Sequence, residues 1–151
     1  MEKTVQPTRT VETNYGIDTR KPILIISDEG DTILHQLIPA ILDSYGYPNI
    51  CAGSDQEVKY ALSTGRRFLG LIVDARVYSR RGSEWVRRIR ERIPGLPALL
   101  IGGHGDLGGL DNSLEAGGRC DLLCIPFSPA QVIERVERLA SLPRIPIPLP
   151  A

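Results

Sequence analysis

Two short apolar segments of this 151-residue chain each end in carboxylates. Asp74 follows the run 70–73, and Asp28 and Glu29 follow the run 23–26. Carboxylates crowded into one place repel each other unless a hard cation bridges them, and Mg²⁺ with oxygen ligands suits this role. The sequence therefore indicates a candidate metal site, provided that the fold brings the two segments together.

Both apolar segments have the pattern of strands that are buried on both faces of a parallel sheet. In such a sheet, ligands bind at the carboxyl ends of the strands. If the first and third strands are neighbours, Asp28 and Asp74 meet there, and we expect the side chain of Asp74 to be displayed rather than packed. The alternative is that Asp74 only starts a turn, as Asp often does.

The rest of the chain supplies the elements that must position these residues. Strands are predicted at 22–26, 49–52, 68–73, 97–101 and 121–125, and helices at 33–42, 54–65, 82–93, 110–116 and 128–139. Pro39 lies inside the first helix and is expected to kink it. Ser54 with Glu57, and Ser128 with Gln131, have the spacing of capping boxes at helix starts.

Strands that alternate with helices predict an α/β fold with a parallel sheet and right-handed crossovers. We expect one domain at 21–141, a flexible leader at 1–20 and an extended proline-rich tail at 142–151.

Composition gives no bias toward nucleic acid or membrane. Lys plus Arg and Asp plus Glu both total 18, and no apolar stretch is long enough to span a bilayer or to form a signal peptide. A cytoplasmic protein is expected. Cys51, Cys120 and Cys124 fit no zinc pattern, and we expect them to be reduced and buried.

Three further features have both a functional and a plain structural interpretation. The segment 76–92 holds seven arginines against two glutamates, which is a basic patch for an acidic partner or simply a solvated helix face. The glycine-rich segment 102–109 either binds an anion through its backbone N–H groups or is a flexible loop. His104, within this segment, either donates a hydrogen bond at the Asp74 site or is an exposed loop residue. Trp85 is expected in the core.

The chain from Pro22 to about Leu139 resembles the receiver domain of two-component response regulators. The similarity lies in the segment 23–29, in the segment 71–74 with Gly82 eight residues after Asp74, and in the segment 125–129. This resemblance implies a flavodoxin-like (CheY-like), doubly wound, five-stranded parallel sheet with strand order 2-1-3-4-5. It also implies a signalling domain and not an enzyme.

In that family, the aspartate that ends the third strand is phosphorylated by a partner histidine kinase. The resemblance therefore assigns Asp74 as the phosphoacceptor. It assigns Asp28, Asp74 and the backbone carbonyl of Arg76 as Mg²⁺ ligands. The reaction is an in-line attack of the carboxylate on phosphorus, in which the metal and a lysine neutralise the developing charge.

Four positions depart from the family pattern. An acidic residue is replaced by Ser27, a hydroxyl residue by Gly102, the lysine by Ile125 and the switch aromatic by Leu122. The metal site is weakened by Ser27, and a charge-assisted contact to the phosphoryl group, worth about 1.5–3 kcal/mol, is lost with the lysine. Because Gly102 cannot donate a hydroxyl hydrogen bond to the phosphoryl group and Leu122 replaces the switch aromatic, any signal from Asp74 should not propagate in the usual way.

We expect a stand-alone, atypical receiver in phosphorelay signalling that acts through protein–protein interaction with a sensor histidine kinase or another signalling protein. Homodimer formation is expected through the last helix, the fifth strand and the weak fourth helix. One alternative is a pseudo-receiver adaptor that binds partners independently of phosphate. Another is a small ligand-binding or enzymatic domain that uses Asp28, Asp74 and His104.

Overall fold

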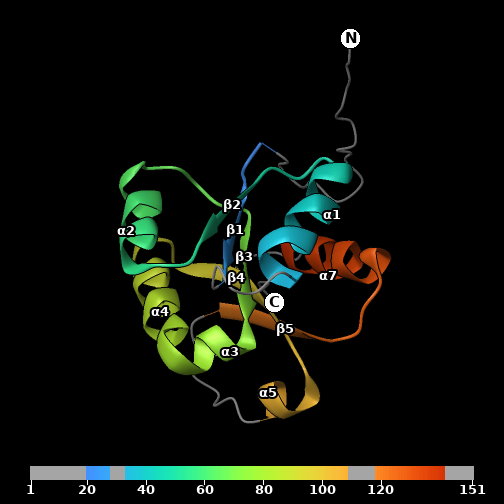
Figure 1. Ribbon diagram of the computed structural model, residues 1–151. Helices are drawn as coiled ribbons and strands as arrows, with labels where there is room; N and C mark the ends of the chain where they lie inside the picture. Colours follow the sequence, from blue (N-terminus) through green and yellow to red (C-terminus); the bar gives the residue numbers. More distant parts are fainter. Residues whose placement is uncertain (1–19, 28–32, 109–117, 142–151) are drawn as a thin grey trace, which may run out of the picture.

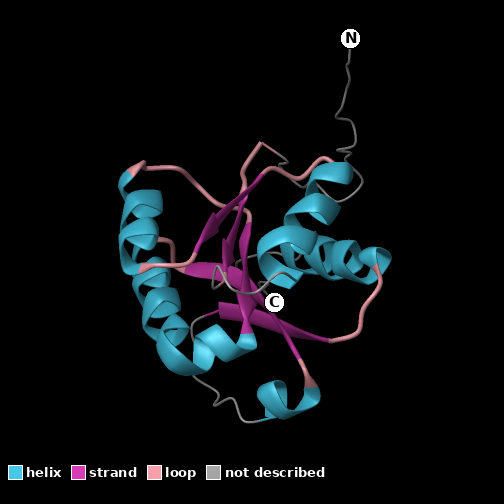
Figure 2. Ribbon diagram, in the orientation of Figure 1, coloured by secondary structure: helices cyan, strands magenta, loops and turns pink. Residues whose placement is uncertain are grey.

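A five-stranded parallel sheet forms the centre of the molecule (Figures 1 and 2). The computed structural model describes residues 20–27, 33–108 and 118–141. The strands are β1 (Ile23–Ile26), β2 (Asn49–Ala52), β3 (Gly70–Asp74), β4 (Gly95–Gly102) and β5 (Gly118–Cys124), and their order is β2-β1-β3-β4-β5. The predicted fold class, the strand order and all five strands are confirmed, with ends that shift by up to three residues.

Helices cover both faces of the sheet (Figure 1). One face carries the π-helical turn η2 (Ile33–Leu37), α1 (Ile38–Ser44) and α7 (Pro129–Ser141). The other carries α2 (Asp55–Ser63), α3 (Ala75–Val77), the π-helical turn η3 (Tyr78–Gly82) and α4 (Ser83–Arg92). The short helix α5 (His104–Gly108) follows β4.

Two apolar clusters lie on the two faces of the sheet. Side chains of successive residues along a strand belong alternately to one cluster and to the other. On β1, Leu24 and Ile26 join the cluster under α2 and α4, whereas Ile23 and Ile25 join the cluster under α1 and α7. Because both faces are covered, every position in the strand is apolar, and the sequence reads as a continuous run instead of an alternation.

Local signals fix the helix starts. Glu57 N–H donates to the Ser54 hydroxyl at 3.1 Å, and the Glu57 carboxylate accepts from Gly53 N–H at 2.7 Å. Ser128 and Gln131 form the second capping box in the same reciprocal way. Both capping boxes are confirmed.

Not every expectation about local structure is confirmed. Pro39 lies in the first turn of α1, directly after the π-helical turn η2, so the chain changes from π-helical to α-helical geometry just before it, and the expected kink stays a prediction. Part of the glycine-rich segment forms α5 rather than a loop. The three cysteines are free, as expected, but each is only half-buried.

Several predictions fall on residues outside the described part of the chain. These are the leader up to residue 19, the carboxylates Asp28 and Glu29, the helix at 110–116 and the tail at 142–151.

Candidate functional site

The carboxyl ends of four strands meet at one edge of the sheet. Asp74, the last residue of β3, is level with Ile101 on β4. Ser27 directly follows β1, whose last residue pairs with the residue before Asp74. The amide of Ile125 donates to the carbonyl of Gly102 at 2.9 Å, which joins the ends of β4 and β5. The fold thus brings the end of β1 beside Asp74, as the sequence predicted.

Asp74 is buried at this edge, with 2% of its surface exposed. One carboxylate oxygen, Oδ1, accepts a hydrogen bond from the backbone N–H of Arg76 at 2.9 Å. The other, Oδ2, lies 3.4 Å from Nη2 of the Arg76 guanidinium. The carboxylate therefore caps the first turn of α3 and also forms an ion pair.

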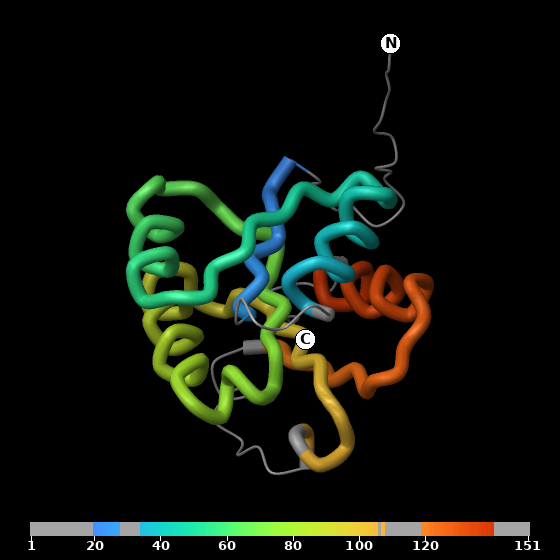
Figure 3. The backbone as a smooth tube through the Cα atoms, in the orientation of Figure 1, coloured from blue at the N-terminus to red at the C-terminus, as the bar shows by residue number. Residues whose placement is uncertain are grey.

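The expectation that the Asp74 side chain is displayed and not packed was wrong. The sequence predicted a helix only from residue 82, but the chain enters α3 at Ala75 and stays helical to Arg92 (Figure 3). The helical turns start directly on the strand end, and the buried Asp74 carboxylate caps the first of them. Both interpretations of Asp74 thus hold in part, because it ends a central strand and also starts a turn.

Arg76 places a positive charge at the candidate phosphoacceptor. Its side chain is 58% exposed although it contacts the buried Asp74 carboxylate. The guanidinium therefore approaches from the solvent side and can swing away without disturbing the core. The resemblance placed the charge of this site at position 125, where Ile125 is instead half-buried against the core under α1 and α7.

Ser27 is fully buried at the end of β1, and its hydroxyl lies 3.5 Å from Nδ1 of His35. His35 is on η2, eight residues later in the chain, and is half-buried. An acidic group at position 27 is thus replaced by a neutral hydroxyl that contacts an imidazole. His35 was not predicted to be part of this site, although its position on the helix that follows β1 was a signal for it.

The other departures from the receiver pattern have clear structural positions. Gly102 is buried at the end of β4 and has no side chain to offer. Leu122 on β5 is 44% exposed, so an apolar side chain lies on the surface where the family has its switch aromatic. His104 is exposed in the first turn of α5, which agrees with its plain interpretation as a surface residue.

The arginine-rich segment is not a uniform solvated face. Arg90 is buried, and Arg88 is half-buried with Nη1 3.2 Å from Oδ1 of Asp55. The indole of Trp85, itself in the core, donates to the same Asp55 oxygen at 3.1 Å. This hydrogen bond, together with the charges of Arg88 and Lys59, lowers the pKa of Asp55 from its usual value. The segment therefore ties α4 to α2, and its other arginines are exposed.

The described donors fit a divalent cation only in part. Asp74 supplies one carboxylate, and Ser27 and the backbone of Arg76 supply neutral oxygens, which are the donor types that Mg²⁺ prefers. In the described residues no three His, Cys, Asp or Glu side chains form a group that could hold a metal. The second predicted carboxylate, Asp28, lies outside that part of the chain.

Sequence comparison finds one short similarity. The chain is 40% identical over 58 residues to the transcriptional activator protein ExaE of Pseudomonas putida, and this match covers 38% of the chain and 27% of the activator. No family model matches the chain. Among the helices of the described segments, none combines the length and apolar character needed to cross a bilayer.

Comparison with solved structures finds receiver domains. Full-length FixJ from B. japonicum matches with a TM-score of 0.65 and 26% identity over 81% of this chain, which spans 58% of FixJ. A putative response regulator from Chloroflexus aurantiacus matches with a TM-score of 0.64 and 26% identity, over 81% of this chain and 99% of that protein. The receiver domain of the sensor histidine kinase PA1611 from Pseudomonas aeruginosa, described with a magnesium ion in its active site cleft, matches with a TM-score of 0.63 and 21% identity, over 80% of this chain and 97% of that domain.

These likenesses confirm the resemblance noted in the sequence. The chain has the fold of a response-regulator receiver domain, and two-component signalling is the process to which these comparisons point. Proteins with this fold in the comparisons are signalling domains rather than classical enzymes.

Proposed function

We propose that this chain, which has the receiver-domain fold of response regulators, is an atypical receiver that acts by binding partner proteins and has Asp74 as its phosphoacceptor. One observation carries the proposal: Asp74 ends the central strand β3, next to the end of β1. In a sheet of order 2-1-3-4-5, this is the switch point at which ligands bind.

The proposed reaction is the transfer of one phosphoryl group to a carboxylate oxygen of Asp74. The oxygen attacks phosphorus in line with the leaving group of the donor, so a new O–P bond forms as the donor's bond to phosphorus breaks. Before attack, the Arg76 guanidinium must move from Oδ2, from which it lies 3.4 Å away. Its exposed side chain can then pair with an equatorial oxygen of the phosphoryl group.

Mg²⁺ is proposed at the same place. Its ligands would be Asp74, the backbone carbonyl of Arg76 and Asp28. Bound there, the ion would neutralise negative charge on the phosphoryl oxygens. Ser27 contributes a neutral hydroxyl already engaged with His35, so we expect weaker binding of the ion than a second acidic residue at that position would give.

Signal output is proposed to occur through the face formed by α7 and β5. Leu122 is 44% exposed there, and the nearby carboxylate of Asp121 pairs with Arg135 and Arg138 of α7. An exposed apolar side chain beside paired charges suits docking of a second protein, either a kinase or a second copy of this chain. Because Gly102 has no hydroxyl to follow the phosphoryl group, we expect phosphorylation to change this face little.

A pseudo-receiver that binds partners without phosphorylation is the second candidate. The observation in its favour is that Asp74 is buried and that Arg76 contacts both of its oxygens. A carboxylate held in this way contributes to the packing of α3 even if it never reacts. The small-enzyme alternative has no comparable observation, since His104 is exposed on α5.

Intact mass spectrometry separates the two candidates. The chain is incubated with Mg²⁺ and acetyl phosphate, and we expect one added phosphoryl group on wild type and none on Asp74→Asn. A control receiver treated in parallel shows that the conditions work. If only the control gains mass, the phosphoacceptor role of Asp74 is wrong and the pseudo-receiver remains.

A further inference from the structure

A pocket lies at the opposite edge of the sheet from Asp74. Its volume is about 570 Å³, and it opens where β1, β3 and β4 begin. This size falls in the range of pockets that hold small organic ligands. We call it the basal pocket; it is lined by Lys21, Leu62, Gly65, Arg66, Arg67, Phe68, Arg92, Ile93 and Pro94.

The lining of the basal pocket carries four positive charges and no carboxylate. The cations are Lys21, Arg66, Arg67 and Arg92. Ion pairs in the described part of the chain join other residues, and none of them includes these four side chains. Clustered like charges repel each other, so this arrangement favours an anion that neutralises them.

Helix ends explain only part of this charge. Arg92 is in the last turn of α4, where a cation interacts favourably with the helix dipole. Lys21 precedes β1, and Arg67 belongs to the connection between α2 and β3, so neither lies on a helix. The helix-dipole interaction therefore does not account for the positive charges of Lys21 and Arg67.

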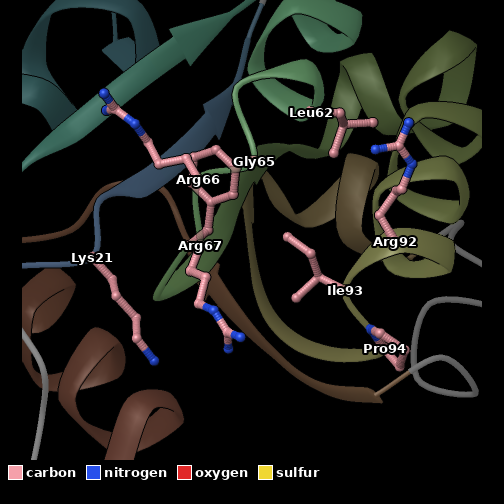
Figure 4. A pocket seen from close by; sticks show the side chains of 9 residues that line it. Lys21, Leu62, Gly65, Arg66, Arg67, Arg92, Ile93 and Pro94 are labelled. Carbon is pink, nitrogen blue, oxygen red and sulfur yellow. The ribbon is translucent and has the colours of Figure 1, made fainter.

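Three of the four cations lie on two sides of an apolar centre in Figure 4. Figure 4 shows Ile93 between Arg92 on one side and the side chains of Arg67 and Lys21 on the other, whereas Arg66 extends away from Ile93. Ile93 is half-buried and Pro94 is exposed, so apolar surface is accessible there. The planar guanidinium groups of Arg67 and Arg92 match phosphate geometry, and the apolar centre suits an organic ring.

We propose that the basal pocket binds an organic anion that carries several phosphate groups, such as a nucleotide. The phosphates contact Arg67, Lys21 and Arg92, and the organic part lies against Ile93 and Pro94. This site is separate from Asp74 and does not depend on phosphorylation of that residue.

The test is calorimetric titration of the full chain with ATP, in EDTA so that metal–nucleotide complexes at the Asp74 edge contribute nothing. Wild type is compared with the double variant Arg67→Gln/Arg92→Gln. The matched control is Lys59→Gln/Arg87→Gln, which removes the same charge from exposed positions on α2 and α4 outside the pocket. Tripolyphosphate, which carries the phosphates without the nucleoside, is titrated in parallel.

We expect ATP to bind wild type and the control variant equally and Arg67→Gln/Arg92→Gln roughly tenfold or more weakly, as the loss of charge-assisted contacts predicts. ATP should also bind more tightly than tripolyphosphate. Asp74→Asn should bind ATP as wild type does. In NMR spectra, the amide signals of Gly65 and Gly95 should shift with ATP, whereas that of Gly103 should not.

Three results would overturn the proposal. They are no binding of ATP at millimolar concentration, an equal loss of binding in the two double variants, and tripolyphosphate binding as tightly as ATP. The thermal midpoints of both double variants should lie within a few degrees of wild type, because the substituted side chains are exposed.

Discussion

Arg90 is the arginine of α4 whose removal should most damage the fold. It is 8% exposed, and its guanidinium donates to the carbonyl of Leu96 from Nε at 3.0 Å and from Nη2 at 2.8 Å. Nη2 also donates to the carbonyl of Arg119 at 3.1 Å. The pairing of β4 with β5 is irregular here. Gly95 pairs with Gly118 and Ala98 pairs with Cys120, so β4 advances by one residue more than β5 between these two pairs. Arg90 thus satisfies carbonyls at an interruption of the ladder.

Replacing Arg90 by Met keeps most of the aliphatic stem but removes every hydrogen bond of the guanidinium. The buried carbonyl of Leu96 then loses two donors and the half-buried carbonyl of Arg119 loses one, at a cost of about 1–3 kcal/mol for each carbonyl and toward the lower end for Arg119. Part of this cost is offset, because the folded state no longer has to desolvate a guanidinium, and this desolvation is also what lowers the pKa of Arg90. We expect a net loss of about 3 kcal/mol in the free energy of unfolding. Over the roughly 110 residues that the structure describes, with an unfolding entropy of about 2.1 cal/mol/K per residue, this lowers the melting temperature by about 13 °C.

Urea unfolding followed by tryptophan fluorescence measures this loss directly, because Trp85 is the one tryptophan of the chain and is buried near α2. The matched control is Arg87→Met on the same helix, whose exposed ion pair with Glu91 should contribute about 0.5 kcal/mol or less. If Arg90→Met unfolds at the same urea concentration as Arg87→Met, the bridging role of Arg90 is refuted.

Two further substitutions test the contacts of α4 and η3. Because the pKa of Asp55 is lowered in the folded state, its carboxylate stabilises the protein above the usual pKa, and this stabilisation is lost as the pH falls through the folded value. Unfolding of wild type and Asp55→Asn should therefore differ at pH 7 and converge in acid, and a difference that is constant with pH would contradict this. In Gly82→Ala, the new Cβ would lie 2.9 Å from the carbonyl oxygen of Val77, so we expect a melting temperature lower by several degrees, from a cost of about 1–3 kcal/mol. Gly105→Ala, whose Cβ meets open space, is the control and should not destabilise the protein.

Much of the fold was predictable because its signals are local. The continuous apolar run 70–73 marked β3, and the Ser54–Glu57 spacing marked the start of α2. The helical turns of α3 and η3 were not predicted, and the reason is also local. The arginine-rich segment 76–82 has no strong apolar period, so no local pattern indicated that it continues as helical turns from the end of β3.

The candidate site was predictable in position but not in environment. The sequence placed Asp74 at a strand end and paired that end with the end of β1, and the register confirms both. It did not predict that Arg76 contacts the carboxylate or that His35 contacts Ser27. These contacts depend on the path of the helical turns over the edge of the sheet, which is set by packing and not by the residues at the site.

Residue pattern alone determined that this chain forms a parallel α/β sheet with a carboxylate at the end of its central strand, because apolar runs and capping residues act on their neighbours in the chain. Only the tertiary structure decided that this carboxylate is buried, that Arg90 belongs to the interior, and that Lys21, Arg67 and Arg92 line one pocket. Those outcomes require residues that are far apart in sequence to meet. Their burial and their partners are therefore properties of the packed molecule.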